Sequence, residues 1–169
     1  MGKYLIIAGT STIGTCTAKK LLQNGHEVFI TGRTAEKTQQ LASELKVDFS
    51  LLDATDVQQV HETVALALER MQSLDGIVNC AGSLLLKAAH LTSAVEFMAT
   101  LNANLMTAFA VCSAAGKYFS STGGSIVLIS SAAALRGLAN HEAIAAAKSG
   151  IIGLARSAAA TYASNNIRF

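Results

Sequence analysis

Cysteine is sparse in this chain, and its few positions bear on two classes of protein. The three cysteines, Cys16, Cys80 and Cys112, are an odd number, lie far apart and form no CxxC pair. This spacing argues against a disulfide framework and against a zinc site, whose cysteine ligands usually come in close pairs. We therefore expect reduced, buried thiols and no bound metal.

Proline is absent altogether. Average usage of about 5% would predict roughly eight prolines in a chain of this length, yet none occurs among the 169 residues. The last residues, Ile167-Arg168-Phe169, look like the beginning of another strand rather than a terminus. We therefore expect the fold to be cut short here, with a proline-bearing segment beyond Phe169; a natural stop is the alternative.

The chain also lacks a run of charge of one sign and a long apolar lead. Lysine and arginine number 13 against 11 acidic residues, and the resulting charge of +2 is scattered along the sequence. This distribution indicates neither nucleic-acid binding nor membrane-surface binding. The N-terminus enters the short apolar run Tyr4–Ile7 without the pattern of a signal peptide or a membrane span, so we expect a cytoplasmic location and no membrane partner.

Short β-rich runs alternate with longer helical patterns, and an apolar content of 51% suits a single domain over residues 1–169. The threonines at 34, 55 and 92 precede three of the helical patterns as candidate caps. The predicted strands are Lys3–Ala8, Glu27–Thr31, Val47–Leu52, Gly76–Asn79 and Ser125–Ser130. The predicted helices are Ile13–Asn24, Ala35–Leu45, Asp56–Met71, Thr92–Phe119 and His141–Ala163.

The predicted strands are nearly all apolar, which is typical of parallel strands covered by helices on both faces. Strands and helices alternate along the chain, and crossovers between parallel strands are right-handed. This alternation therefore predicts an α/β fold: a Rossmann-type, doubly wound parallel sheet flanked by helices in three layers. Ligands of such sheets bind outside the carboxyl ends of the strands.

The segment Ala8–Gly14 follows the first predicted strand. Its small residues allow a sharp turn that brings backbone N–H groups toward a pyrophosphate at a helix N-terminus. The hydroxyls of Thr10, Ser11 and Thr12 add hydrogen-bonding groups. Strict G-x-G-x-x-G spacing is missing, and glycine is common in any strand-to-helix turn, so the turn alone is weak evidence.

The residues at the ends of the next three predicted strands add evidence for a nucleotide site. Where NAD-binding proteins usually place an acidic residue, the second strand ends in Gly32-Arg33, and Arg33 can pair with the 2′-phosphate of NADP(H). NADP(H) is therefore favoured over NAD(H), with a merely solvated arginine as the alternative. Asp53-Ala54 and Asn79-Cys80-Ala81-Gly82 end the next strands, although Asp53 could instead cap a helix and Gly82 could simply turn the chain.

These motifs, in this order, resemble the short-chain dehydrogenase/reductase family along essentially the whole chain. Ala8–Gly14 is similar to that family's TGxxxGxG turn, with Gly14 at its last glycine and Ala8 and Thr12 at the first and second; a one-residue deletion aligned on Gly9 is the alternative. The resemblance implies a dinucleotide site that comprises Gly9, Ser11, Thr12, Ile13, Gly14, Arg33, Asp53, Ala54, Asn79, Ala81, Gly82 and Lys148. It also implies that the family's substrate loop follows Phe169.

The resemblance further implies the active-site residues, with one departure. Asn104 matches the family's helix asparagine, Ser131 its catalytic serine and Lys148 its lysine, but Ile144 stands where the family has tyrosine, four residues before the lysine. In the family the serine holds the substrate oxygen, while the tyrosine exchanges its proton and the lysine lowers the tyrosine pKa. Lys148 can still bind the nicotinamide ribose, but Ile144 can exchange no proton.

His141 is the nearest side chain that titrates near neutral pH, and helical spacing places it on the side of Ile144 and Lys148. It is a candidate substitute acid, with a solvated or capping histidine as the alternative. The last predicted helix is rich in alanine and glycine, which permits close helix packing. Family resemblance implies that this helix and Thr92–Phe119 form a homodimer or homotetramer interface.

Two functions follow from these patterns. The first is an NADP(H)-dependent oxidoreductase that acts on a small carbonyl or alcohol substrate with an altered acid/base. The second is a catalytically impaired NADP(H)-binding protein that serves as a sensor or interaction partner. A structural protein that binds no nucleotide is a third reading.

Overall fold

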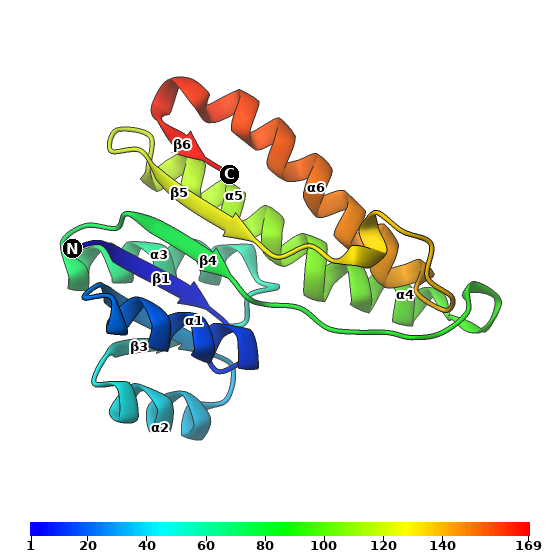
Figure 1. The fold of residues 1–169 in the computed structure, drawn as a ribbon, viewed down its shortest axis with the longest axis horizontal. Helices are drawn as coiled ribbons and strands as arrows, with labels where there is room; N and C mark the ends of the chain where they lie inside the picture. Colours follow the sequence, from blue (N-terminus) through cyan, green and yellow to red (C-terminus); the bar gives the residue numbers. More distant parts are fainter.

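Six parallel strands form one sheet in the computed structural model, which describes residues 1–169. The sheet order is β3-β2-β1-β4-β5-β6, so the chain reverses its direction of travel between β1 and β4 (Figure 1). The predicted doubly wound fold is confirmed, and a strand does begin at Ile167. The strands are β1 Lys3–Ile7, β2 Glu27–Gly32, β3 Asp48–Leu51, β4 Gly76–Asn79, β5 Gly124–Leu128 and β6 Ile167–Arg168.

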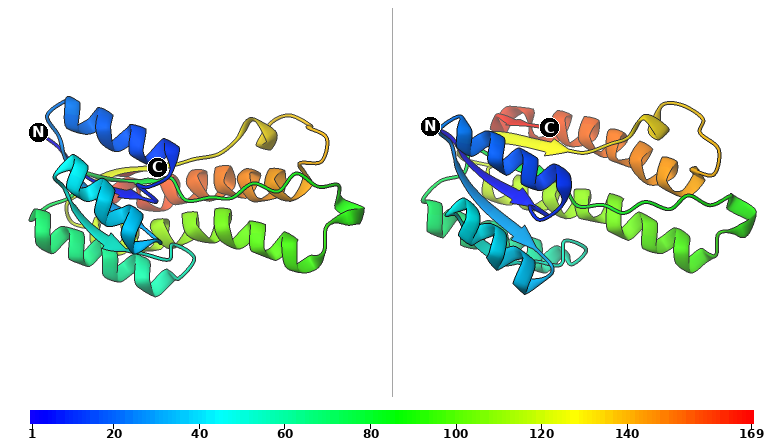
Figure 2. Two further views of the ribbon diagram at one scale, coloured as in Figure 1. Left: turned by 90° about the horizontal axis from the view of Figure 1, so that it is seen from below. Right: turned by 60° about the horizontal axis from the view of Figure 1, so that its bottom comes forward.

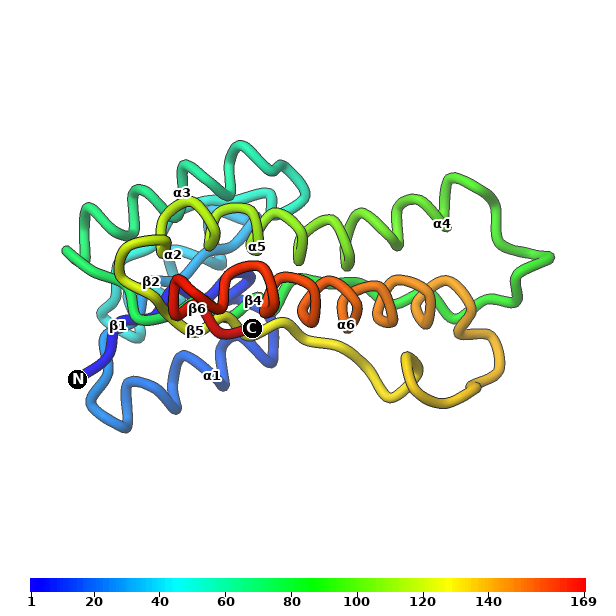
Figure 3. Tube along the Cα trace, turned by 90° about the horizontal axis from the view of Figure 1, so that it is seen from above, coloured from blue at the N-terminus to red at the C-terminus, as the bar shows by residue number.

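Helices cover the two faces of the sheet unequally (Figure 2). The first two helices pack on β1, β2 and β3, and the remaining ones lie across the opposite face. Figure 3 shows α4 and α5 lying end to end, with α6 running beside them, and all three helices reach beyond the sheet or toward its end. The helices are α1 Thr12–Gln23, α2 Ala35–Leu45, α3 Val57–Met71, α4 Ala94–Leu101, α5 Thr107–Tyr118 and α6 Glu142–Tyr162.

Alternation along the central strand divides the core into two layers. Leu5 and Ile7 of β1 pack with α3 and α5 in a cluster of 18 buried residues. Ile6, between them, joins a cluster of 5 buried residues on the α1 and α2 side. Because successive strand residues point to opposite faces, both faces of β1 must be apolar. This explains the uninterrupted apolar run in the sequence.

Two strands, β5 and the edge strand β3, depart from the expected coverage by helices on both faces. Val127 of β5 is 46% exposed, because it faces the α1 side of the sheet and lies beyond the strands that α1 and α2 cover. Three of the four residues of β3, an edge strand, are also exposed. The expectation of buried thiols was wrong for Cys16, which is exposed on α1; Cys80 is half-buried and Cys112 is buried.

Two of the expected helix caps were wrong by one residue. The α3 N-cap is Asp56 rather than Thr55, and its carboxylate accepts hydrogen bonds from two backbone N–H groups of the first turn. The α4 N-cap is Ser93 rather than Thr92, and Ser93 forms a reciprocal capping box with Glu96. Thr34 is the α2 N-cap but makes no side-chain capping bond.

The long helix predicted over Thr92–Phe119 is interrupted by a π-helical turn at Asn102–Met106, between α4 and α5. Such turns often mark functional sites. The stretch Ala94–Tyr118 is long and apolar enough to cross a membrane by length and composition alone. This is weak evidence, because a core helix passes the same test and 44% of its apolar window is buried in the fold.

Candidate functional site

The turn after β1 is held by its own hydrogen bonds. Ala8 has a φ of 55°, a left-handed conformation that favours glycine. This conformation supports the alignment that places Ala8, rather than Gly9, at the family's first glycine. The Ser11 hydroxyl donates to the Ala8 carbonyl oxygen at 2.7 Å and accepts the Gly14 N–H at 3.1 Å. Ser11 is therefore the N-cap of α1, and its hydroxyl proton is used within the turn.

Gly14 is required by close approach between helix and turn. A Cβ at position 14 would overlap the Ala8 carbonyl oxygen and would lie 2.8 Å from the Gly9 Cα. Thr15 adds a hydrogen bond from its Oγ1 to the Gly9 carbonyl oxygen at 2.9 Å. Such a turn brings the helix N-terminus close to the strand end, which is the geometry that accommodates a pyrophosphate. The residues present therefore fit a dinucleotide.

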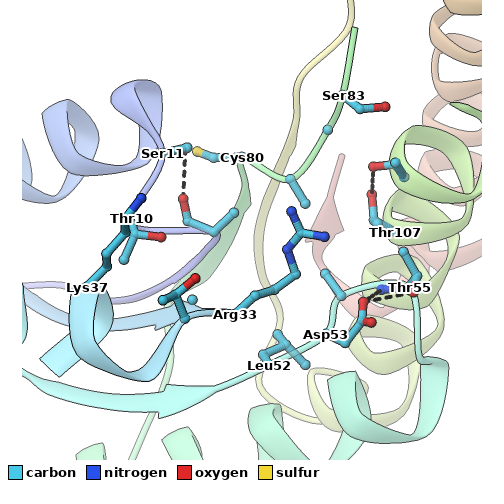
Figure 4. A pocket seen from close by; sticks show the side chains of 17 residues that line it. Thr10, Ser11, Arg33, Lys37, Leu52, Asp53, Thr55, Cys80, Ser83 and Thr107 are labelled. Atoms are coloured by element: carbon cyan, nitrogen blue, oxygen red, sulfur yellow. Dashed lines mark hydrogen bonds between the residues drawn. The ribbon is translucent and has the colours of Figure 1, made fainter. Parts of the chain in front are cut away.

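A cavity of about 330 Å³ opens at the carboxyl ends of the strands, beside this turn. Six of the predicted cofactor residues line it, namely Ser11, Arg33, Asp53, Ala54, Ala81 and Gly82. Arg33 extends into the middle of the cavity, and Asp53 and Cys80 lie on opposite sides of it (Figure 4). Burial raises the pKa of the Cys80 thiol to about 11, so this wall of the cavity carries a neutral thiol.

The end of β2 has no room for an acidic side chain. A Cβ on Gly32 would overlap Thr38 Oγ1 and would lie 3.0 Å from Thr10. Thr38 is completely buried, and its hydroxyl donates to the Thr34 carbonyl oxygen at 2.7 Å, so it cannot move aside easily. Arg33 is consequently the first long side chain after the strand, and it carries positive charge into the cavity.

Asp53 ends the segment after β3 and presents a carboxylate to the cavity. Its Oδ1 accepts hydrogen bonds from the Thr55 N–H at 3.0 Å and from the Thr55 hydroxyl at 2.8 Å. These bonds, with a smaller contribution from nearby Arg33, lower the pKa of Asp53. Asp53 is therefore ionised and oriented. The alternative reading of Asp53 as a helix cap was wrong, because Asp56 caps α3.

Asn79 and Asn104 are buried, and the hydrogen bonds of their side chains join neighbouring segments around the cavity. The Asn79 side chain accepts the Ala81 N–H at 3.1 Å and donates to the Thr107 hydroxyl at 3.3 Å, which fixes the chain after β4 against α5. Asn104, in the π-helical turn, donates to the Ser83 carbonyl oxygen at 3.2 Å and accepts the Ser83 N–H at 3.4 Å. Neither side chain lines the cavity; each positions residues that do.

Lys148 and the two serines after β5 lie close together but do not line the cavity. Lys148 Nζ donates to the Ile129 carbonyl oxygen at 2.8 Å, and Ser130 Oγ donates to the Lys148 carbonyl oxygen at 3.0 Å. Ser131 Oγ accepts the Ala133 N–H at 3.2 Å and has no acceptor for its own proton. The hydrogen bonds therefore separate the serines: Ser130 anchors α6, and the Ser131 hydroxyl remains able to donate.

Lys148 is buried without a carboxylate partner. This burial lowers the pKa of its ammonium group. A Cβ on Gly82 would lie 3.5 Å from Lys148 Nζ and 2.8 Å from Asn104 Oδ1, so the segment after β4 passes directly beside both side chains. The lysine therefore adjoins the segment after β4, which belongs to the predicted cofactor site.

His141 lies at the start of α6, and its Nδ1 is 2.7 Å from the Ala139 carbonyl oxygen. It makes no hydrogen bond to Ser131, Asn104 or Lys148. Ile144 is 3% exposed, one helical turn before Lys148. The position four residues before Lys148 thus holds no side chain that can exchange a proton.

The structure also shows what sequence patterns missed. Gly9 and Gly14 shape the turn, whereas Thr12 and Ile13 lie exposed at the start of α1 and outside the cavity wall. Lys37, Ser83 and Thr107 were not predicted but line the cavity. The signal for Lys37 was its position four residues after Arg33, on the predicted helix; Ser83 and Thr107 gave no local signal.

The fold and this cavity define an enzyme class, NAD(P)-binding oxidoreductases with a Rossmann sheet. A family profile described as short chain dehydrogenase matches residues 3–169. The chain belongs to the short-chain dehydrogenase family.

Relatives and solved structures agree with this assignment. The chain is 32% identical to carbonyl reductase family member 4 of Danio rerio, over 97% of this chain and 70% of the relative. It is 33% identical to the 3-oxoacyl-[acyl-carrier-protein] reductase FabG of Chlamydia trachomatis, over 97% of this chain and 69% of the relative. A short chain dehydrogenase from Mycobacterium smegmatis superposes with a TM-score of 0.95 at 26% identity, covering 99% of this chain and 74% of its own. ElxO with NADP bound superposes with a TM-score of 0.92 at 31% identity, covering 98% and 70%.

Proposed function

We propose that this chain is an NADP(H)-dependent oxidoreductase that transfers hydride between the nicotinamide and a small carbonyl or hydroxyl compound, with an altered acid/base. The observation that carries the proposal is the cavity at the carboxyl edge of the sheet, where Arg33 enters a space lined by the turn after β1 and the segment after β4. The relatives named as carbonyl and 3-oxoacyl reductases support a carbonyl substrate.

The preference for NADP(H) over NAD(H) rests on the end of β2. NAD-binding proteins use an acidic residue there to accept hydrogen bonds from the ribose hydroxyls. Here the crowding around Gly32 disfavours any side chain at that position, and Arg33 offers a cation for a 2′-phosphate. Two solved structures of similar fold, ElxO and actinorhodin polyketide ketoreductase, hold NADP or NADPH.

The chain's own residues divide the remaining work. A bound nicotinamide supplies the hydride chemistry, so the protein needs to position it and to handle the substrate oxygen. Ser131 can donate its free hydroxyl proton as a hydrogen bond to that oxygen. Lys148 uses one of its three donors on Ile129 and keeps the others for the ribose hydroxyls. Asn104 holds Ser83 and thereby positions the segment that passes beside Lys148.

Ile144 determines how far this chemistry proceeds. A positioned general acid contributes about 10²–10⁴-fold in rate, and the buried Ile144 has no proton to exchange. His141 is the candidate substitute, since it begins the same helix and its Nε2 makes no hydrogen bond within the chain. The second candidate function, a catalytically impaired NADP(H)-binding protein, is favoured by the same Ile144.

Calorimetric titration with NADPH and with NADH tests the first step of the proposal. We expect tighter binding of NADPH and a smaller difference in Arg33→Ala; an unchanged preference would show that Arg33 is not the selector. No binding of either cofactor would overturn both candidate functions and leave a structural protein.

Turnover separates the two candidates. We expect the wild type to oxidise NADPH slowly with generic carbonyl compounds, His141→Gln to abolish that rate if the histidine is the acid, and Ile144→Tyr to raise it. Tight NADPH binding with no turnover in any of these proteins would favour the binding-protein function.

We also propose a homodimer or homotetramer, a cytoplasmic location and no nucleic-acid or membrane partner. Support for the oligomer comes from the exposed apolar residues of α4 and α5, where Val95 is 79%, Met98 52% and Phe109 49% exposed. Gly150 of α6 lies against Leu105, so small residues already bring α6 close to the same helical layer. Sedimentation velocity would measure the oligomeric state, and a monomer at micromolar concentration would contradict it.

A further inference from the structure

Ser83 follows Gly82 on the segment after β4, and its exposed side chain lines the cavity. Figure 4 shows it on the side of the cavity opposite Asp53. Its hydroxyl oxygen accepts a hydrogen bond from Asn104 Nδ2 at 3.3 Å, but its hydroxyl proton has no acceptor within the chain. Ser83 therefore offers a hydrogen-bond donor to a molecule bound on this side of the cavity.

The other hydroxyls of the cavity are used or lie elsewhere. Three of them donate their protons within the chain, namely those of Ser11, Thr55 and Thr107. The remaining two, on Thr10 and Thr34, belong to the turn after β1 and to the start of α2. Ser83 is thus the free hydroxyl donor on the segment that passes beside Lys148.

Asn104 holds Ser83 in a defined orientation. The Asn104 side chain donates to the Ser83 carbonyl oxygen at 3.2 Å and to the Ser83 hydroxyl at 3.3 Å, and it accepts the Ser83 N–H at 3.4 Å. Asn104 is itself 1% exposed and donates to the Thr100 carbonyl oxygen at 2.9 Å. Because Asn104 occupies one side of the Ser83 hydroxyl, the hydroxyl proton points elsewhere. A donor held in this way needs little reorganisation to stabilise a charge that develops beside it.

The segments that carry Ser83 and Ser131 leave the sheet side by side. They follow the neighbouring parallel strands β4 and β5, whose last residues pair in register. Further along the two segments are joined again, because the Lys87 N–H donates to the Asn140 carbonyl oxygen at 2.8 Å. Ser83 and Ser131 therefore lie on neighbouring segments that start from the same edge of the sheet.

The buried Lys148 lies between these two segments. Its Nζ donates to the carbonyl oxygen of Ile129 at 2.8 Å, two residues before Ser131. A Cβ on Gly82, the residue before Ser83, would lie 3.5 Å from the same Nζ. Two hydroxyls with free protons thus belong to the two segments that contact one ammonium group. Such donors stabilise a carbonyl oxygen as it gains negative charge.

We propose that Ser83 is a catalytic residue whose hydroxyl donates a hydrogen bond to the substrate oxygen together with Ser131; this role rests on the proposed oxidoreductase function. The carbonyl carbon gains a hydride from the reduced nicotinamide, which is thereby oxidised, and the electron pair of the C=O π bond moves to the oxygen. Ser83 stabilises the resulting alkoxide by hydrogen bonding and gives up no proton. The proton that completes the alcohol still comes from water or from His141. Ser83 thus adds a donor to a site in which Ile144 supplies none.

The kinetic test compares wild type, Ser83→Ala and Ser83→Thr, with Ser43→Ala as the matched control. Ser43 is exposed on α2 and lies outside the cavity. Calorimetry measures the Kd of NADPH, and NADPH oxidation at saturating cofactor gives kcat and KM for cyclohexanone and for ethyl acetoacetate. We expect Ser83→Ala to lower kcat about 10²-fold without a change in the Kd of NADPH. Ser83→Thr keeps the hydroxyl and should keep most of the rate, and Ser43→Ala should match wild type.

Infrared difference spectroscopy gives a second readout that needs no turnover. NADP⁺ carries no hydride to transfer, so a ketone bound together with NADP⁺ stays intact. Hydrogen bonds to its oxygen weaken the C=O bond and lower its stretching frequency, which a ¹³C label separates from the bands of the protein. We expect the frequency to rise in Ser83→Ala and to stay at the wild-type value in Ser83→Thr and Ser43→Ala.

The two readouts separate failure of the Ser83 role from failure of the proposed function. An unchanged carbonyl frequency in Ser83→Ala would overturn the role of Ser83, whatever happens to kcat. Weaker NADPH binding with an unchanged frequency would make Ser83 a cofactor-binding residue instead. A wild type that binds NADPH but gives neither turnover nor a bound-carbonyl band with either ketone would overturn the proposed oxidoreductase function itself.

Discussion

Gly14 and Gly153 are both helical glycines, and replacing each by alanine should change stability in opposite directions. Helix propensity alone predicts that glycine to alanine stabilises an exposed helix interior by about 0.8–1 kcal/mol. At Gly153 of α6 a Cβ would meet nothing within 4 Å in the chain, so Gly153→Ala should deliver that gain. At Gly14 of α1 the same Cβ would overlap the backbone of the turn after β1.

The size of the stability change in Gly14→Ala follows from the atoms that the added Cβ would contact. The Ala8 carbonyl oxygen, the Gly9 Cα and Ser11 Oγ are the nearest atoms, and two of them are backbone atoms that no rotamer change can move. Overpacking costs about 1–3 kcal/mol, and overlap with backbone atoms places Gly14→Ala in the upper part of that range, at about 2–3 kcal/mol, which outweighs the gain of about 1 kcal/mol in propensity. We expect a net loss of about 1–2 kcal/mol and, because the turn opens, weaker NADPH binding.

Urea denaturation followed by circular dichroism measures both changes. With a slope of about 2 kcal/mol per molar urea, the Gly14→Ala midpoint should fall by about 0.5–1 M and the Gly153→Ala midpoint should rise by a smaller amount. The oligomeric form is compared by size exclusion, so that an effect of Gly153→Ala on assembly is recognised. Equal stabilisation by the two substitutions would refute the tight approach of α1 to the turn.

Two further predictions concern polar groups outside the cavity wall. His61 on α3 has a pKa below its ordinary value of 6.5, because burial and then Lys117 disfavour its charged form. The folded state therefore binds fewer protons than the unfolded state just below pH 6.5, so the free energy of unfolding should fall as the pH drops through this range. In His61→Gln this fall should be shallower; an identical pH dependence of unfolding would contradict the assignment. Asn104→Ala should cost about 2–3 kcal/mol, because Ser83 and Thr100 lose their hydrogen bonds to a side chain that is 1% exposed. Asn104→Asp should be at least as costly at neutral pH, because it loses the donated hydrogen bonds and places a buried carboxylate against the Ser83 and Thr100 carbonyl oxygens. Thermal unfolding in which Asn104→Asp is the milder variant would count against this role of Asn104.

The sequence by itself determined the fold class and the location of the site. Apolar strand runs such as Tyr4–Ile7 alternate with helical patterns, and right-handed crossovers leave few arrangements of such a chain. The carboxyl ends of the strands then meet at one edge, so the sequence alone predicts that Arg33, Asp53 and the segment after β4 lie near one ligand. Helix ends were less certain, because adjacent residues such as Thr55 and Asp56 can both cap and local patterns do not choose between them.

Only the tertiary structure decided what each side chain does there. The sequence alone does not distinguish Ser130 from Ser131. In the fold, the Ser130 hydroxyl donates to α6, whereas the Ser131 hydroxyl proton has no acceptor. Gly32 reads as an ordinary turn residue until Thr38 is placed against it, and Lys37 becomes part of the cavity only because α2 returns across β2. The local sequence determines which backbone conformation each residue favours and how often apolar residues recur. The hydrogen-bond partner of a polar atom depends instead on which segments the whole fold brings within hydrogen-bonding distance.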